Sequence, residues 1–201
     1  MAERGTYAKG RAKRDEIVDV AVDVFAEVGY DRTSLRDIAR RANLSQAGLL
    51  HHFKNKEELF LEVLRRRDVR NEHFYEETGN PAVSLPGLVE IVRHNAQEPG
   101  LVRLYVTMSA ESTAADSTAR DFFHDRFAKL LDDVAADIRH RKESGDFPAH
   151  LDEHAVASLL VAAADGLQLQ WLLDPSGFDM GDRLELLVEL LKSPKAADAT
   201  T

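Results

Sequence analysis

The segment from Ser45 to Phe53 combines an amide, two very small residues and an imidazole ring on one short stretch: Gln46, Ala47, Gly48 and His51. A glutamine amide can pair with the edge of adenine, and alanine or glycine can lie against the methyl group of thymine. A histidine ring adds one further hydrogen-bond donor. If these residues lie on the outward side of a short helix, that helix matches the major groove of B-DNA, where every base pair presents a distinct pattern.

Three other polar residues, Thr33, Ser34 and Lys56, lie at or beside the expected N-termini of helices. Backbone N–H groups and the helix dipole favour an anion such as a phosphate at these positions. Ser34 also begins an S-x-x-D capping box that Asp37 completes, so capping alone is sufficient to explain this serine.

Helices are needed to position these residues, and hydrophobic residues recur at helical spacing along almost the whole chain. The pattern predicts an all-α protein. Two short helices, capped by Ser34 and Ser45 and separated by a turn at Asn43, lie between longer helices that begin near Lys13 and at Lys56. This arrangement is a helix-turn-helix unit. Further helices are predicted over 85–97, 100–111, 116–144, 152–173 and 179–193.

The 201 residues allow one domain with a small appendage, or two small domains. The net charge is −9, yet residues 1–56 contain 11 Lys and Arg against 8 Asp and Glu, a balance of +3, which leaves −12 for the remainder. This asymmetry fits either a nucleic-acid-binding segment or a solvated basic tail.

Several kinds of catalytic site lack support in the sequence. The absence of cysteine excludes thiol catalysis, thiolate zinc sites and disulfides, and fits a reducing compartment. His150 and His154 have an i, i+4 relation, but H-L-D-E-H is not H-E-x-x-H, so no metal site is predicted. No G-x-G-x-x-G, P-loop or G-x-S-x-G motif is present. We therefore expect a protein that is not an enzyme and has no cofactor.

The sequence predicts neither export nor a membrane span. The N-terminus has no apolar stretch of the kind that a secretory signal needs. The longest uninterrupted apolar stretch is 159–164, far short of the ~20 residues that cross a bilayer. We therefore expect a cytoplasmic protein that does not contact membranes.

Two motifs in fixed order carry a family resemblance. The run T-S-L-R-D-I-A-R-R-A-N-L-S from Thr33 to Ser45 is followed by G-L-L-H-H-F-K-N-K-E-E-L from Gly48 to Leu59. With its flanks, from Ile17 to Leu64, this segment resembles the N-terminal domain of the TetR family of bacterial transcriptional regulators. Nothing after Leu64 adds to the resemblance.

The resemblance assigns roles to residues by their positions. It implies that Arg36, Gln46, Ala47, Gly48 and His51 face bases, with Ser45 at the start of the same helix. It also implies that Thr33, Ser34, His52 and Lys56 face the DNA backbone.

Two positions depart from the family pattern. Members commonly have a tyrosine that reaches a phosphate where this chain has Leu50, so we expect that contact to be lost or moved to His51 or His52. The usual glycine of the turn is Asn43, which tolerates the same backbone angles.

Other interpretations of the same residues stay open. Arg36 can be a solvated surface residue, and His52 can serve packing inside the small domain. The basic residues near the N-terminus can form a mobile tail or an arm that follows the DNA phosphates. These residues are Arg4, Lys9, Arg11, Lys13 and Arg14.

For the remainder of the chain, the resemblance implies a larger helical domain with a ligand pocket among its middle helices and a dimer formed by the last two. The sequence favours the dimer independently, because these helices have more apolar surface than one small domain covers. The residues concerned are Leu159, Ala163, Gly166 and Gln170, with Leu184, Leu187, Val188 and Leu191.

Polar and large apolar residues at helical spacing are the candidates for the pocket. Each can equally be a satisfied core or interface residue. The candidates are Arg93, His94, Tyr105, Met108, Glu111, Phe127, Asp165, Gln168 and Trp171.

These observations predict a ligand-responsive transcriptional regulator, a repressor that binds a palindromic double-stranded DNA operator as a homodimer and is released by an unknown small molecule. The alternatives are a helical carrier or interaction module without sequence-specific DNA binding, and a DNA binder without an effector. The predicted organisation is a DNA-binding domain at 1–56 with a basic, disordered arm at 1–12, a connecting helix at 57–80, a ligand-binding and dimerisation domain at 81–193, and a disordered tail at 194–201.

Overall fold

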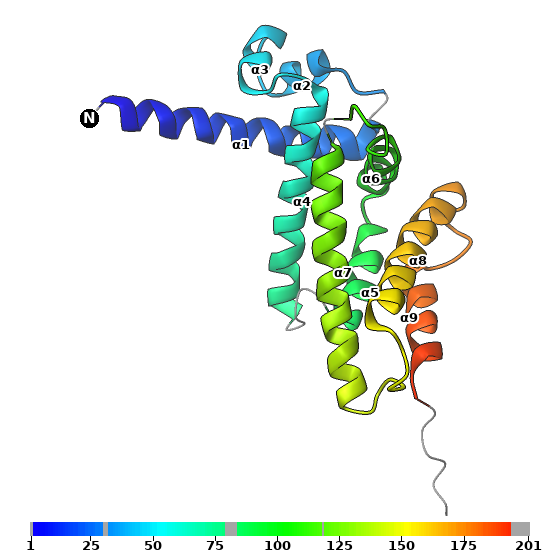
Figure 1. The fold of residues 1–201 in the computed structure, drawn as a ribbon. Coiled ribbons are helices and arrows are strands. Elements are labelled where there is room, and N and C mark those ends of the chain that lie inside the picture. The colour runs from blue at the N-terminus through cyan, green and yellow to red at the C-terminus, as the bar shows by residue number, and fades with distance from the viewer. Residues whose placement is uncertain (1, 30–31, 79–83, 118, 194–201) are drawn as a thin grey trace, which may run out of the picture. The chain divides into compact units, whose positions relative to one another are not determined.

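The computed structural model describes residues 2–29, 32–78, 84–117 and 119–193, with side chains described from residue 10 onward except in 70–83. Within these ranges the secondary structure is α-helical and contains no strand, which confirms the predicted fold class (Figure 1). The helices are α1 Ala2–Val28, α2 Leu35–Arg41, α3 Gln46–His52, α4 Lys56–Thr78, α5 Leu85–Asn95, α6 Pro99–Glu111, α7 Arg120–Glu143, α8 Glu153–Leu173 and α9 Met180–Leu191.

Two helices begin several residues away from their predicted starts. The first helix begins at Ala2 instead of near Lys13, and therefore includes most of the segment expected to be a disordered arm. That segment has no periodic apolar pattern, which is why the predicted helix did not extend into it. Helix α7 begins at Arg120, because the residues after α6 form turns in which the Arg120 guanidinium donates to the carbonyl of Thr113 at 2.8 Å.

The chain folds as two compact units. One comprises Met1–Phe74 with Gln97–Phe123, and the other comprises Tyr75–Ala96 with His124–Thr201. The first unit thus joins α6 to the N-terminal helices, although α6 lies far along the chain. The predicted domain boundaries at 56/57 and 80/81 remain predictions.

The first unit is built around large buried aromatic and aliphatic side chains. Phe25 of α1, Ile38 of α2, Leu49 of α3 and Phe60 of α4 are all fully buried. Helix α6 approaches α1 so closely at Gly100 that a Cβ there would lie 1.9 Å from the carbonyl oxygen of Ala26. Glycine is therefore required at this crossing of α1 and α6.

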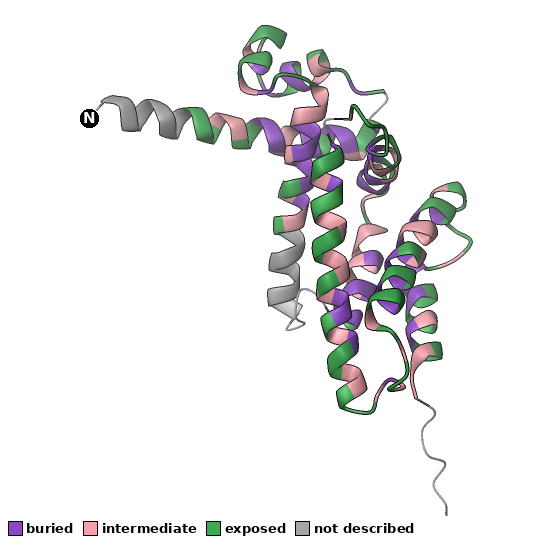
Figure 2. Ribbon diagram, viewed as in Figure 1, coloured by how far each residue is buried: buried purple, intermediate pink, exposed green. Residues whose placement is uncertain are grey.

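In the second unit, α9 packs against α5 and α8. Leu160 of α8 and Leu184 of α9 are fully buried in its core, with Val134 and Ile138 of α7. Figure 2 shows buried and exposed positions interleaved along α8 and α9.

Helix α8 is, among the described helices, long and apolar enough to cross a membrane by length and composition. The sequence prediction of no membrane span rested only on the uninterrupted apolar stretch 159–164, which ends before Asp165. One side of α8, including Val156, Leu160 and Val161, is buried within its own unit, as in the core helix of a helical domain.

Candidate nucleic-acid interface

Helix α2 begins with the capping arrangement that the sequence predicts. The Ser34 hydroxyl oxygen accepts the backbone N–H of Asp37 at 3.1 Å and donates to the Asp37 carboxylate at 2.5 Å. Arg40 donates to the other carboxylate oxygen at 3.1 Å. The Ser34 hydroxyl is thus already committed to local partners, which supports its role as a cap.

The same contacts lower the pKa of Asp37 below its ordinary value. The hydrogen bond from the Ser34 side chain is the main cause, with further lowering by its backbone and by the positive charges of Arg40 and Arg36, while partial desolvation opposes the shift. Asp37 therefore stays ionised and keeps Arg40 on the same face of α2.

The turn between α2 and α3 has the geometry expected from Asn43. This residue has φ of 54°, in the left-handed region, where asparagine is among the tolerated residues. The following N–H, of Leu44, donates to the carbonyl of Ala39 at 2.8 Å. Ser45 then caps α3, because its hydroxyl accepts the N–H of Gly48 at 3.0 Å.

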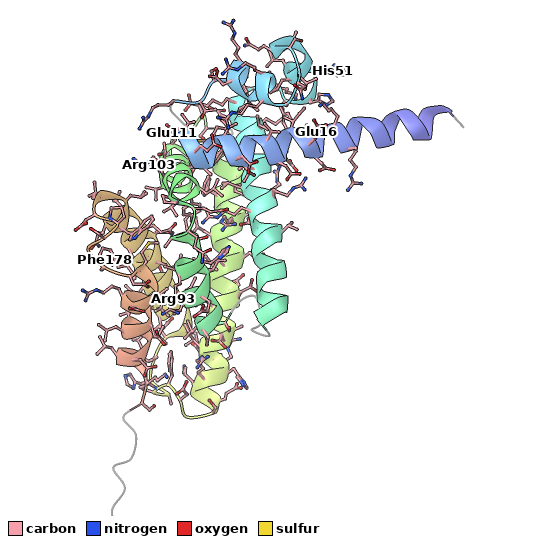
Figure 3. All side chains as sticks on the ribbon, turned by 180° about the vertical axis from the view of Figure 1, so that it is seen from behind. Glu16, His51, Arg93, Arg103, Glu111 and Phe178 are labelled. Atoms are coloured by element: carbon pink, nitrogen blue, oxygen red, sulfur yellow. The ribbon has the colours of Figure 1, made fainter. Side chains whose placement is uncertain are left out.

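Helix α3 presents one face to the core and the other to solvent. Leu49 and the C-cap residue Phe53 are fully buried, whereas Gln46, Ala47 and His51 are exposed. Figure 3 marks the position of His51 on this helix. The buried pair anchors α3, so the residues predicted to face bases point outward.

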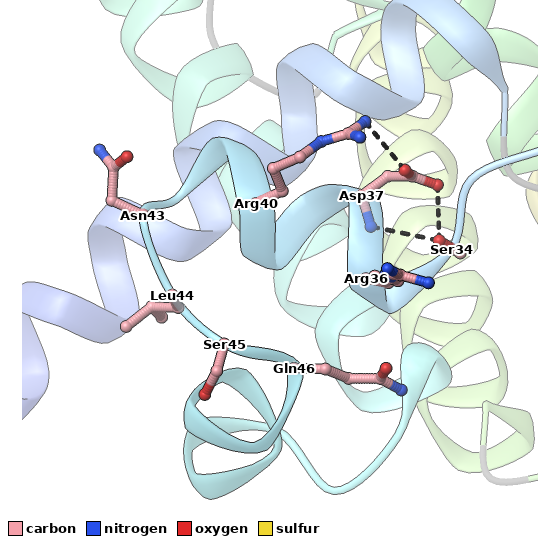
Figure 4. A pocket seen from close by; sticks show the side chains of 8 residues that line it. All are labelled: Ser34, Arg36, Asp37, Arg40, Asn43, Leu44, Ser45 and Gln46. Carbon is pink, nitrogen blue, oxygen red and sulfur yellow. Dashed lines mark hydrogen bonds and ion pairs between the residues drawn. The ribbon is translucent and has the colours of Figure 1, made fainter.

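A shallow hollow lies at the junction of α2 and α3 (Figure 4). It is lined by Ser34, Arg36, Asp37, Arg40, Asn43, Leu44, Ser45 and Gln46. Sequence reasoning missed Arg40, whose side chain is 78% exposed. The available signal was its i, i+4 relation to Arg36, which places both guanidinium groups on one face of α2.

The predicted DNA-facing residues differ in their exposure. Thr33 is buried, and its hydroxyl donates to the carbonyl of Gly29 at 2.7 Å. Its side chain therefore does not face a phosphate, contrary to the sequence prediction. The reason is that Thr33 closes the connection from α1 to α2. Gly48, His52 and Lys56 are half-buried, whereas the exposed members are Ser34, Arg36, Ser45, Gln46, Ala47 and His51.

His52 is packed beside His51 in an edge-to-face arrangement, with ring centroids 5.6 Å apart. Burial lowers the pKa of His52, and the nearby positive groups of His51, Arg14 and Lys13 lower it further. His52 therefore favours the neutral form in the folded chain. Leu50, two residues before His52, has an apolar side chain that is 40% exposed.

The K-N-K-E-E motif starts helix α4. The Asn55 side-chain oxygen accepts the N–H of Glu58 at 2.7 Å, and the Glu58 carboxylate accepts the N–H of Lys54 at 2.8 Å. This pair is a variant of the capping box, because Glu58 accepts from Lys54, the residue before Asn55, and not from Asn55 itself. It leaves Lys56 at the first position of α4, beside the positive end of the helix dipole.

The structure divides the predicted pocket residues between the two units. Tyr105 and Met108 are buried and Glu111 is exposed in the first unit, where the Tyr105 ring lies 5.8 Å from that of Phe123. The others lie in the second unit, namely Arg93, His94, Phe127, Asp165, Gln168 and Trp171.

Within the second unit, some of these residues already have internal partners. Arg93 of α5, labelled in Figure 3, donates to Glu90, Asp182 and Glu185 at 2.5, 3.0 and 3.2 Å. The hydrogen bond with Asp182 is the main cause of its raised pKa. The buried Gln168 amide donates to the carbonyl of Ala164 at 3.4 Å.

Two short helices joined by a tight turn, with the second exposing polar and small side chains, define a helix-turn-helix protein of the DNA-binding class. Residues 17–63 match the model of bacterial regulatory proteins of the tetR family, and residues 87–193 match the C-terminal model of BetI-type transcriptional repressors. The chain belongs to the TetR family. Family membership indicates a regulator of transcription rather than an enzyme.

Known proteins are similar to this chain over different lengths. The HTH-type transcriptional regulator AcrR of Shigella flexneri is 24% identical over 199 residues, covering 93% of each chain. The repressor KstR2 of Mycolicibacterium smegmatis is 42% identical over 60 residues, 30% of this chain and 29% of KstR2. A crystal structure of a putative transcriptional regulator from Saccharomonospora viridis in complex with choline superposes with a TM-score of 0.75 at 26% identity, over 90% of this chain and 98% of that one.

Proposed function

We propose that this protein is a cytoplasmic, homodimeric repressor that binds a palindromic operator through α3 and leaves it when a small molecule binds in the C-terminal part. The observation that carries the proposal is the arrangement of α3. Its buried anchors Leu49 and Phe53 turn Gln46, Ala47 and His51 to the surface, beside the exposed arginines of α2. Amide, methyl and guanidinium groups on one face suit the edges of bases in the major groove.

Phosphate contacts are proposed for the residues around this face. Lys56 and the backbone at the start of α2 lie at helix N-termini, where phosphates are favoured. Arg36 and Arg40 border the hollow next to Gln46. Because Thr33 is buried, only its backbone remains for such a contact.

The proposed dimer uses a seam along α8. Residues spaced alternately four and three apart are exposed or half-buried on one side of this helix, which is the spacing of a coiled-coil seam. The seam consists of Ala155, Leu159, Ala162, Gly166, Leu169 and Leu173.

Helix α9 adds exposed leucines to the proposed interface. Leu186 and Leu190 are 52% and 73% exposed, whereas Leu184 and Val188, which the sequence placed in the interface, are buried within the unit. These two residues lie in the core that α9 forms with α5 and α8, so they are not available to a partner chain. Pairing α8 and α9 with their copies across a two-fold axis gives a four-helix bundle. Such a dimer would present two α3 helices to two half-sites.

The effector is proposed to bind within the second unit, which contains six of the nine predicted pocket residues. The similar structure from Saccharomonospora viridis holds choline, and the matching C-terminal model is that of BetI-type repressors. Choline is therefore the first ligand to test, followed by other quaternary amines and by uncharged amphiphiles.

The test is in vitro selection of duplex DNA by the purified protein, followed by a mobility-shift titration of the selected site with and without choline. We expect a palindromic consensus, binding by two chains, and release by an effector. Selection of no consensus would refute the repressor function and favour the interaction module. A specific complex that no ligand in the panel affects would refute this effector class.

A further inference from the structure

Two short helices of the DNA-binding unit end in carbonyl groups that are held by neighbouring residues of α1. The Lys13 ammonium donates to the carbonyl of Ala42, the C-cap of α2, at 3.0 Å. The Arg14 guanidinium donates to the carbonyl of His52, the last residue of α3. Carbonyls at helix C-termini have no partner within the helix and carry partial negative charge, so cations are favourable there.

Arg14 makes three further contacts that fix its orientation. Its guanidinium carbon lies 4.1 Å from the centroid of the Phe53 ring, and Phe53 is the buried C-cap of α3. Its Nη2 lies 3.2 Å from Glu58 and 3.7 Å from Glu62, both on α4. A planar guanidinium can stack on a ring and donate in its own plane at the same time, which a lysine ammonium cannot do.

Glu58 connects this arginine to the start of α4. One carboxylate oxygen accepts from Arg14, and the other accepts the N–H of Lys54 at 2.8 Å. The pKa of Glu58 is lowered overall: partial burial opposes the shift, but the Lys54 N–H and the Arg14 guanidinium outweigh it. The end of α3, the start of α4 and α1 therefore meet at one ionised pair.

From these contacts we infer that Arg14 is a positioning residue for the recognition helix, assisted by Lys13 at the end of α2. It sets the position of α3 against α1 and α4 through the His52 carbonyl and the Phe53 ring. This role differs from the phosphate contact that its basic sequence neighbourhood suggested. The inference rests on the proposed function, in which α3 reads DNA.

The two roles have different signatures in DNA binding. A residue that contacts a phosphate contributes to binding of every sequence, and its loss lowers the salt slope by about one. A residue that only positions α3 contributes to the base contacts of the operator complex. Its loss lowers the ratio of operator to non-specific affinity and leaves the salt slope unchanged.

The experiment uses the full chain and an operator selected in vitro from random duplexes. Affinities for this operator and for a scrambled duplex are measured over a range of salt concentrations for the wild type, Arg14→Ala, Arg14→Lys and Glu58→Gln. Arg11→Ala is the matched control, because Arg11 is an exposed arginine on the same helix.

We expect Arg14→Ala to lower operator affinity about tenfold or more, as for loss of a hydrogen bond from a charged donor, with little change for the scrambled duplex. Arg14→Lys keeps the charge and is expected to recover only part of the loss. Glu58→Gln is expected to lower the same ratio by a smaller factor. Arg11→Ala is expected to leave the ratio unchanged.

Equal losses on both duplexes with a reduced salt slope would overturn the inference in favour of a phosphate contact. An unchanged ratio in folded Arg14→Ala would overturn it as well. If circular dichroism shows Arg14→Ala to be unfolded, Arg14→Lys and Glu58→Gln decide the question by the same ratio. A wild type that selects no sequence would instead refute the proposed function and, with it, the inference.

Discussion

At the scale of single residues, His52 makes the stability of the fold depend on pH. Its ring is half-buried beside His51, and burial together with three positive neighbours lowers its pKa below the usual value of about 6.5. The unfolded chain therefore binds more protons at this site than the folded chain between the two pKa values. By linkage, stability increases with pH across this window.

We expect the folded chain to lose stability as the pH falls through about 6.5, and this loss to level off below the lowered pKa of His52. In His52→Gln the corresponding part of the pH dependence is absent. The measurement is the urea midpoint between pH 8 and pH 5.5 at fixed protein concentration. His140→Gln on α7, at an exposed histidine, is the control and is expected to follow the wild-type profile. A His52→Gln profile parallel to the wild type would contradict this prediction.

Operator affinity separates two residues with different proposed contacts. Lys56→Ala removes a charge beside a helix N-terminus, so we expect weaker binding of all sequences and a salt slope lower by about one. Gln46→Ala removes an amide from the exposed face of α3, so we expect relaxed preference at one base position, worth about 1–3 kcal/mol. Mobility shifts on the operator and its single-base variants over a salt series measure both effects. A lower salt slope in Gln46→Ala together with relaxed base preference in Lys56→Ala would instead assign the phosphate contact to Gln46 and the base contact to Lys56.

At the scale of helices, local signals predicted the elements of the DNA-binding unit well. The caps at Ser34 and Ser45 and the left-handed turn at Asn43 have their predicted geometry, because each depends on residues three or four positions apart. The exposure of Gln46 and His51 followed from the same pattern.

Contacts between distant parts of the chain were not predictable in this way. The bonds from Lys13 to Ala42 and from Arg14 to His52 join residues 29 and 38 positions apart, and no periodicity encodes them. Thr33 was misjudged for a similar reason, because its burial depends on how α1 and α2 meet. The periodicity of the sequence likewise did not predict that α6 belongs to the first unit.

Gly100 provides a test of the close approach between α1 and α6. A Cβ at this position would overlap the backbone of Ala26, which cannot move without shifting α1. We expect Gly100→Ala to destabilise the fold by about 1–3 kcal/mol, as overpacking does. Gly10→Ala is the control, since a Cβ there meets nothing within 4 Å, and alanine is expected to stabilise this helix by about 0.5–1 kcal/mol. Urea unfolding of both variants decides, and equal stability of Gly100→Ala and the wild type would contradict the packing at this crossing.

At the scale of the whole molecule, the last two helices carry leucines whose side chains are exposed in the described part of the chain. Leu159, Leu169 and Leu173 on α8 are 68%, 53% and 83% exposed. Exposed apolar surface that is contiguous at coiled-coil spacing marks an interaction site. Operator recognition by two α3 helices needs such a pairing, because one helix-turn-helix contacts only one half-site.

We expect Leu169→Glu to convert the proposed dimer into a monomer, because the proposed two-fold axis would bring two carboxylates into one apolar interface. Helical content is expected to remain, since Leu169 is exposed in the single chain. Val69→Glu also replaces an apolar side chain by a carboxylate, at a residue of α4 that is 47% exposed. It is the matched control and is expected to stay dimeric. Sedimentation velocity measures the assembly state, and mobility shifts measure the accompanying loss of operator affinity. A Leu169→Glu chain that remains dimeric and binds the operator as the wild type does would place the dimer interface elsewhere, and the seam on α8 would need another partner.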